Sequence, residues 1–126
     1  SQNRARVLIS MGSVVPDFLT HVIFASNDLT TRNPDLARRF LVAWFEIIAY
    51  MNAHEDETIR ITDKVTGLPP DIAKIVYKEQ MPMFSRDGRF DPKALTVVER
   101  TFRDLALLDH TPDTKTLYTE EFLPEH

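Results

Sequence analysis

The chain contains no cysteine among its 126 residues, so disulfide bonds, thiolate metal sites and cysteine nucleophiles are excluded. It has only three glycines, Gly12, Gly67 and Gly88, and these lie far apart in the sequence. A loop that cradles phosphate needs glycines close together, so that motif is also lacking. Uninterrupted apolar runs are a few residues long, far shorter than a membrane-spanning helix requires.

An excess of basic residues is lacking as well. The 15 Lys and Arg residues are scattered and are outnumbered by 19 Asp and Glu residues, which gives a formal net charge of -4. This balance argues against a nucleic-acid partner and against an anionic membrane surface. With 43% hydrophobic and 27% charged residues, the composition is that of an ordinary globular protein, and the length predicts a single domain.

Two short apolar runs near the N-terminus predict β-strands. Residues 5–10 read ARVLIS and residues 20–26 read THVIFAS, both rich in β-branched or aromatic side chains. Pro16 lies between them and marks a break, because proline cannot donate a ladder hydrogen bond. Two strands are only marginally stable alone, so this pattern predicts further strands or a covering layer of helices.

The strongest helical signal covers residues 33–54. Asn33 is a favourable N-cap, Pro34 suits the first helical position, and Asp35 complements the positive end of the helix dipole. Six apolar residues fall on one stripe at helical spacing: Leu36, Phe40, Trp44, Ile47, Ile48 and Met51. Past Phe40, apolar residues surround most of the helix, which predicts burial on nearly all sides.

Three further helices are predicted after residue 54. Residues 55–67 begin with acidic side chains and end at Gly67, residues 68–81 contain an early proline and stop at Pro82, and residues 91–110 begin with an Asp-Pro pair. The chain is therefore expected to be mainly α, with about four helices after two N-terminal strands. Four apolar residues of the irregular tail predict that it packs back onto another part of the protein: Leu117, Tyr118, Phe122 and Leu123.

No catalytic or metal-binding constellation stands out among the polar residues. The acidic turn of residues 54–57 has the chemistry of a weak cation site, but an acidic first turn is already explained by the helix dipole. Asp17 and Asp28 flank the second predicted strand, where they form an acid–base pair or simply two turns. His21 lines a ligand cleft or is a hydrogen-bonded histidine at a strand edge. We expect no enzyme activity, no metal and no cofactor.

A series of short motifs follows in a fixed order along the chain. A strand ends near Gly12, then come VVPDF, a strand closing in FAS, NPDLARRFL opening a long helix, MNAH at its end, and acidic residues. The sequence FLPE lies close to the C-terminus. This order resembles the NMT1/THI5-like substrate-binding proteins, which include the nitrate, sulfonate and taurine receptors of bacterial ABC transporters.

The resemblance implies an α/β fold of the two-lobed type II periplasmic-binding-protein class, with a ligand cleft between the lobes. Residues 1–126 would then be one segment from the C-terminal part of such a receptor. Residues 1–21 would form the end of the second lobe and the hinge crossing, and residues 22–126 the helical completion of the first lobe. It also implies a periplasmic or lipoprotein-anchored extracytoplasmic location, with a signal peptide in the N-terminal part that precedes this segment.

The resemblance implies binding without chemistry. The ligand would be a small solute, either an anion such as nitrate, a sulfonate or taurine, or a pyrimidine, and the receptor would deliver it to an ABC permease. Five hinge-proximal residues would face the cleft: Gly12, Ser13, Asp17, Thr20 and His21. Each also suits a plain turn or hinge. Two alternatives remain, namely a thiamine-pyrimidine synthesis enzyme of the same superfamily, whose branch carries a cysteine-rich motif, and a stand-alone helical interaction module.

Unpaired strands and a helix that is apolar on nearly all sides also predict self-association of these 126 residues. Such surfaces are the usual setting for exchange of strands or domains between copies. We therefore expect a dimer or a higher assembly of the isolated segment.

Overall fold

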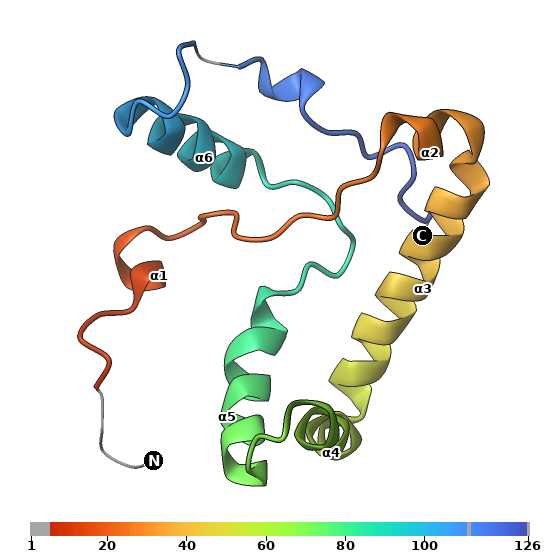
Figure 1. Ribbon diagram of the computed structural model, residues 1–126, viewed down its shortest axis with the longest axis vertical. Coiled ribbons are helices and arrows are strands. Elements are labelled where there is room, and N and C mark those ends of the chain that lie inside the picture. The colour runs from red at the N-terminus through yellow and green to blue at the C-terminus, as the bar shows by residue number, and fades with distance from the viewer. Residues whose placement is uncertain (1–5, 111, 126) are drawn as a thin grey trace. The chain divides into compact units, whose positions relative to one another are not determined.

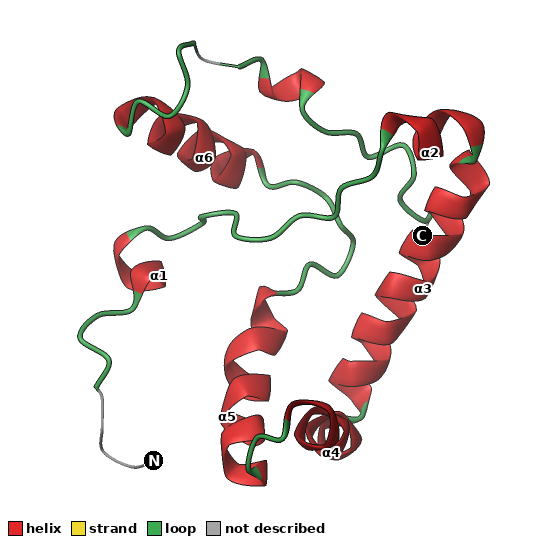
Figure 2. Ribbon diagram, in the orientation of Figure 1, coloured by secondary structure: helices red, strands yellow, loops and turns green. Residues whose placement is uncertain are grey.

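The computed structural model describes residues 6–110 and 112–125, and within them every regular element is a helix (Figure 2). The mainly helical character predicted from the sequence is therefore confirmed. The elements follow in the order shown in Figure 1: α1 Met11–Val14, α2 Asn27–Arg32, α3 Pro34–Ala53, α4 Glu55–Thr66, α5 Pro70–Gln80 and α6 Pro92–Asp104. Two single turns of 3-10 helix cover Met81–Met83 and Thr114–Thr116.

The chain divides into two compact units. The first comprises Ser1–Phe24 and Phe90–Thr119 and contains α1 and α6. The second comprises Ala25–Arg89 and Glu120–His126 and contains α2 to α5. The second unit is thus built from two separate stretches of sequence, because the chain leaves it after Arg89 and returns at Glu120.

The two predicted N-terminal strands are not confirmed. Residues 6–10 and 20–25 have no regular secondary structure, while Ala5 lies outside the described residues. Ser26, the predicted end of the second strand, caps α2 instead. A strand forms only when its N–H and C=O groups pair with a neighbouring strand, and the described residues provide no such neighbour for either run. Apolar, β-branched composition was therefore an insufficient signal.

Helix α2 was not predicted. The Ser26 hydroxyl oxygen accepts a hydrogen bond from the Leu29 N–H at 3.2 Å, which satisfies one of the free donors of the first turn. Asp28 lies in that turn and forms an ion pair with Arg32 at 2.8 Å. Asp28 therefore lies in a helix and not in a turn beside a strand. Its negative charge in the first turn interacts favourably with the helix dipole, and it forms an i,i+4 ion pair.

Helix α3 has the predicted limits but much less burial than predicted. Only Ala37 and Ile48 are buried along its length. Leu36, Phe40 and Ile47, three members of the predicted core stripe, keep 48%, 52% and 55% of their surface exposed. The helices that pack against α3 within its unit, α2 and α4, leave much of its surface exposed. The expected burial on nearly all sides is wrong for the described structure.

Helices α4 and α5 pack against each other, and both contact the C-terminal part of α3. Gly67 ends α4 in the left-handed conformation at φ 68°, as its position after the last apolar residue predicted. The hydroxyl of Tyr77 in α5 donates to the Met51 carbonyl at 2.8 Å, and the Thr58 hydroxyl in α4 donates to the His54 carbonyl at 2.9 Å. Side chains from the next two helices thus satisfy carbonyls at the end of α3.

Helix α6 begins as predicted and ends earlier than predicted. Asp91 caps it by accepting from the Lys93 N–H at 2.8 Å. It ends at Asp104, because Ala106 adopts the left-handed conformation at φ 50° and the Leu107 N–H turns back to the Phe102 carbonyl at 2.9 Å. This is the bond that closes a left-handed helix cap, here without the usual glycine. The predicted extension to residue 110 is therefore wrong.

Candidate functional site

The five candidate ligand-binding residues lie on one exposed stretch of the first unit. Gly12 and Ser13 belong to α1, a single turn of four residues. The Ser13 hydroxyl donates to the Ser10 carbonyl at 2.7 Å, so it stabilises the start of that turn. Both residues are exposed, as are Asp17, Thr20 and His21.

The other three candidates behave as turn or loop residues. Asp17 has φ 61°, the left-handed conformation that Asp and Asn tolerate in turns. His21 Nδ1 lies 3.1 Å from the hydroxyl oxygen of its neighbour Thr20. This is the one hydrogen-bonded contact that the described structure gives between two of the five. Two surface hollows are present elsewhere in the described residues, and neither is lined by any of the five.

A cluster of polar and aromatic side chains occupies the junction between α3 and α4. The Tyr50 hydroxyl donates to Glu57 Oε2 at 2.6 Å, and Arg60 donates to Glu57 Oε1 at 3.2 Å. The rings of Tyr50 and His54 stack with centroids 4.0 Å apart. Sequence reasoning noticed the acidic turn of residues 54–57 but missed Tyr50, one helical turn earlier. Within the described residues, no group of three or more acidic or histidine side chains is arranged to hold a metal ion.

The hydrogen bond between Tyr50 and Glu57 shifts the pKa values of the two groups in opposite directions. It holds the pKa of the Glu57 carboxyl below its ordinary value and raises the pKa of the Tyr50 hydroxyl. The lowered pKa of Glu57 stabilises the folded state at any pH above the pKa of the unfolded chain. This stabilisation is lost as the pH falls through the pKa of the folded state. The raised pKa of Tyr50 stabilises the folded state at any pH below the pKa of the unfolded chain. This stabilisation is lost as the pH rises through the pKa of the folded state.

Replacing Tyr50 with phenylalanine is expected to raise the pKa of Glu57, because the hydrogen bond that favours its charged form is removed. A carbon-detected NMR titration of the Glu57 carboxyl measures this shift. Tyr77→Phe is the matched control, since the Tyr77 hydroxyl donates to the Met51 carbonyl and not to Glu57. An unchanged Glu57 pKa in Tyr50→Phe would show that the hydrogen bond is not formed in solution.

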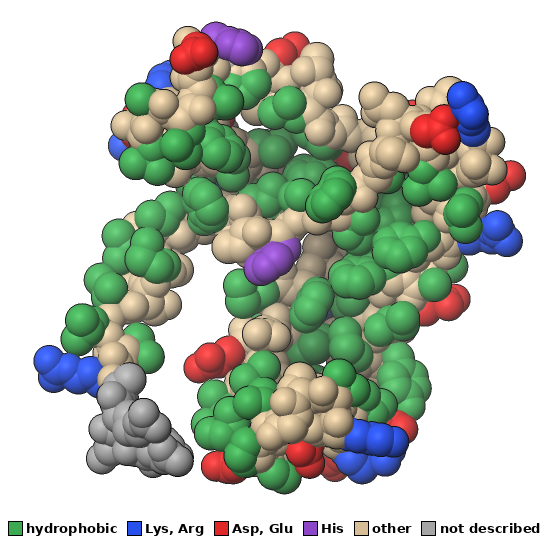
Figure 3. All heavy atoms as spheres, in the orientation of Figure 1, with side chains coloured by type: hydrophobic (Ala, Val, Ile, Leu, Met, Phe, Trp, Pro, Cys, Tyr) green, Lys and Arg blue, Asp and Glu red, His purple; other side chains and the backbone are tan. Residues whose placement is uncertain are grey.

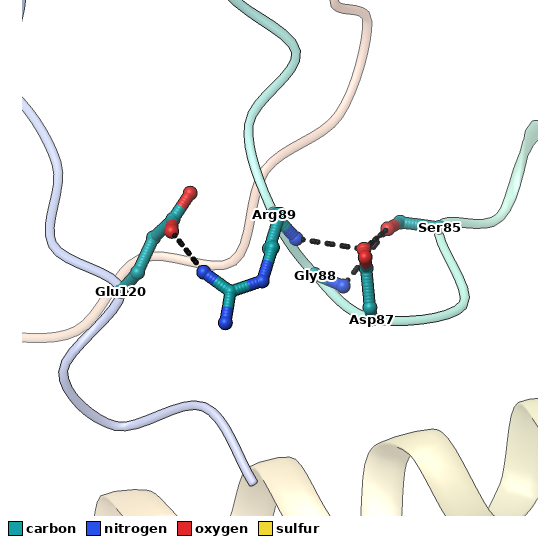
Figure 4. A network of polar contacts seen from close by, with 5 residues as sticks. All are labelled: Ser85, Asp87, Gly88, Arg89 and Glu120. Atoms are coloured by element: carbon teal, nitrogen blue, oxygen red, sulfur yellow. Dashed lines mark hydrogen bonds and ion pairs between the residues drawn. The ribbon is translucent and has the colours of Figure 1, made fainter. Parts of the chain in front are cut away.

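A second polar network lies where the chain leaves and re-enters the second unit (Figure 4). The Asp87 carboxylate accepts from the Ser85 hydroxyl at 3.2 Å and from the Arg89 N–H at 3.0 Å. The latter bond in particular holds the pKa of Asp87 below its ordinary value. The Gly88 N–H donates to the Ser85 hydroxyl at 2.9 Å, and Arg89 forms an ion pair with Glu120 at 3.0 Å.

The C-terminal segment packs onto the second unit beside this network. Phe122 is buried at 8% exposure, and the Arg38 guanidinium lies 5.4 Å above its ring. A Cβ atom at Gly88 would lie 2.6 Å from Phe45 Cζ and 2.7 Å from Leu123 Cδ2. The absence of a side chain at Gly88 therefore lets the tail approach α3. The predicted packing of the tail is confirmed for Phe122, whereas Leu117 is 65% exposed.

The two networks described above join neighbouring segments of the second unit. No protein-family model matches the chain, and comparisons with curated proteins and with solved structures found no match. Among the described residues, no helix has both the length and the apolar character needed to cross a membrane.

Proposed function

We propose that the chain is the C-terminal part of the solute-binding component of a bacterial ABC import system. In this proposal the complete receptor lies outside the cytoplasm and binds a small solute in a cleft between two lobes. It then delivers that solute to a membrane permease. The receptor does no chemistry and needs no cofactor, and it works by closing its lobes about a hinge.

The order and spacing of the sequence motifs carry this proposal. Several motifs coincide with structural features of the chain, which supports their origin in a fold and not in chance. NPDLARRFL contains Pro34, the first residue of α3; MNAH contains Ala53, its last; and the acidic residues that follow open α4 at Glu55. FLPE contains Phe122, a buried contact of the tail.

The ligand of this proposal is a small anion or a pyrimidine. Oxyanions are commonly held by hydroxyls and backbone N–H groups, and the exposed hydroxyls of Ser13 and Thr20 have that chemistry. His21, next to Thr20, would add a ring nitrogen. Gly12 and Asp17 would shape the turn that presents these groups.

The coding sequence upstream of Ser1 provides the first test. We expect it to continue in frame for most of two α/β lobes, with genes for a permease and an ATPase nearby. A reading frame that begins at or close to Ser1 would contradict the proposal. Thermal-shift screening of the complete protein with nitrate, sulfate, taurine, alkanesulfonates and pyrimidines would then identify the ligand class.

Within the complete receptor, Ser13→Ala and Thr20→Ala are each expected to weaken anion binding about 10-fold, the effect of one lost hydrogen bond to a charged group. Isothermal titration calorimetry with the anion that gives the largest thermal shift measures this change. Thr31→Ala is the matched control, because Thr31 is an exposed threonine in α2. Equal affinities for the unaltered receptor and the three variants would show that neither the Ser13 nor the Thr20 hydroxyl binds the anion.

A second candidate function is that of a helical interaction module. It is favoured by the half-exposed apolar residues of α3, which are not covered in the second unit. The same upstream sequence separates the two candidates, because an interaction module does not need two missing lobes. The thiamine-pyrimidine synthesis enzyme is a third candidate, whose cysteine-rich motif would lie in the N-terminal part that precedes this segment. A cysteine-rich motif in the upstream coding sequence would support it.

A further inference from the structure

An apolar stripe with coiled-coil spacing runs along the exposed side of α3. Its members are three or four residues apart in strict alternation, with exposures of 48% for Leu36, 52% for Phe40, 55% for Ile47 and 46% for Tyr50. Ala43, also exposed, occupies the middle position. A repeat of this kind keeps one seam facing a partner helix over several turns.

This stripe is separate from the face of α3 that the second unit buries. That face contains Ala37 and Ile48, one position along the helix from Leu36 and Ile47. A shift of one residue turns a side chain by about 100° around the helix axis. Figure 3 shows hydrophobic side chains exposed on the side of α3 that is turned toward the viewer. The helix therefore has two apolar faces, of which its own unit covers one.

Two charged residues border the stripe on one side. Arg39 and Glu46 are exposed and lie two helical turns apart, about 10 Å along the axis. The ion pairs of the described residues include the neighbouring Arg38 with Asp35 but neither Arg39 nor Glu46. Both charges are available to a partner that presents the opposite sign at the same separation.

We propose that this stripe is the seam of an antiparallel homodimer in which α3 pairs with α3 of a second copy. The twofold axis passes beside Ala43, whose small side chain allows the two helices to approach closely. Leu36 and Tyr50 lie seven residues on either side of Ala43, and Phe40 and Ile47 lie three and four residues from it. Leu36 therefore meets Tyr50 of the second copy, and Phe40 meets its Ile47 to within one residue. An isologous contact of this kind requires one surface to be complementary to itself.

The charges select the antiparallel arrangement. With Ala43 at the axis, Arg39 of each copy lies beside Glu46 of the other, which gives two ion pairs at the rim of the seam. A parallel pair would instead place Arg39 beside Trp44 and Glu46 beside Met51, with no opposite charge. The dimer depends only on α3, so it does not rest on the proposed transport function.

The first test is the mass of the chain in solution and of two matched variants. Sedimentation equilibrium should give twice the mass of the 14.6 kDa chain at micromolar concentration. Ala43→Glu, which places two like charges at the axis, should raise the dissociation constant about 50-fold. Ala49→Glu is the control, because Ala49 is also exposed on α3 but lies away from the stripe. Circular dichroism checks that both variants keep their helices.

Three results would overturn the proposal. A monomer at these concentrations would show that no second copy covers the stripe. A dimer that tolerates Ala43→Glu would place the interface elsewhere. If Ala43→Glu and Ala49→Glu weaken the dimer equally, the added negative charge and not its position in the stripe causes the loss of affinity.

The second test establishes the direction of the helices. Arg39→Glu should weaken the dimer several-fold, because each new carboxylate faces Glu46 of the other copy. Adding Glu46→Arg to the same chain should restore the affinity, since the two ion pairs reform with reversed signs. A double variant no tighter than Arg39→Glu would rule out the antiparallel pairing. An affinity that is independent of salt would rule out the ion pairs.

Discussion

Replacing Phe122 with alanine is expected to lower the free energy of unfolding of the second unit by about 3 kcal/mol. A buried phenylalanine truncated to alanine loses its transfer free energy and leaves a cavity, which together cost about 3–5 kcal/mol in protein cores. Phe122 is 8% exposed and comes from a terminal segment, so the lower end of that range applies. The loss also removes the ring beneath the Arg38 guanidinium.

Guanidinium denaturation followed by circular dichroism measures this change. Protein concentration is kept constant, because self-association adds to apparent stability. Phe24→Ala is the control, since Phe24 is 90% exposed and its truncation should change stability by less than about 0.5 kcal/mol. Hydrogen exchange at the Leu123 N–H, which donates to the Glu120 carbonyl at 3.1 Å, should accelerate in Phe122→Ala alone. Equal denaturation midpoints for Phe122→Ala and Phe24→Ala would show that the tail is not packed.

The magnitudes decide what holds the tail in place. The ion pair between Arg89 and Glu120 joins side chains that are 65% and 29% exposed, and pairs of this kind contribute about 0.2–1 kcal/mol. The burial of Phe122 contributes several times more. The ion pair therefore sets where the chain returns to the second unit, and the aromatic ring supplies most of the free energy that keeps it there.

Local signals explain which helices could be predicted from the sequence. Pro34, Pro70 and Pro92 each occupy a first helical position, and Gly67 ends α4 with a positive φ. These features act through the backbone of their own residues, so they hold whatever surrounds the helix. The N-cap at Asn33 is an exception in detail, because its side chain makes no capping bond.

Features that depend on distant residues could not be predicted in the same way. The runs at residues 6–10 and 20–25 have strand composition, but the described chain gives them no neighbouring strand. The end of α6 depends on a left-handed alanine, Ala106, which carries no sequence signal comparable to glycine. The five candidate site residues were grouped as one ligand site by the resemblance, and no local pattern could show whether they converge on a ligand.

The packing around Gly88 likewise depends on residues far away in the sequence, and it leads to a sharp prediction. Gly88 has φ 75°, which costs a residue with a Cβ atom roughly 1–2 kcal/mol. A Cβ atom there would also be far too close to Phe45 and Leu123, and overpacking costs roughly 1–3 kcal/mol. Gly88→Ala is therefore expected to destabilise the second unit by about 3 kcal/mol.

Gly67→Ala separates the two causes in this prediction. Gly67 has φ 68°, but a Cβ atom there meets nothing within 4 Å, so only the backbone cost of about 1 kcal/mol applies. Denaturation of both variants should show Gly88→Ala losing clearly more stability. Adding Leu123→Ala to Gly88→Ala removes one of the two crowded side chains, so the double variant should lose less than the two single losses combined. If Gly67→Ala and Gly88→Ala are equally destabilised, the tail does not pack against the turn at Gly88. If the double variant is additive, Leu123 is not the side chain that the new Cβ atom displaces.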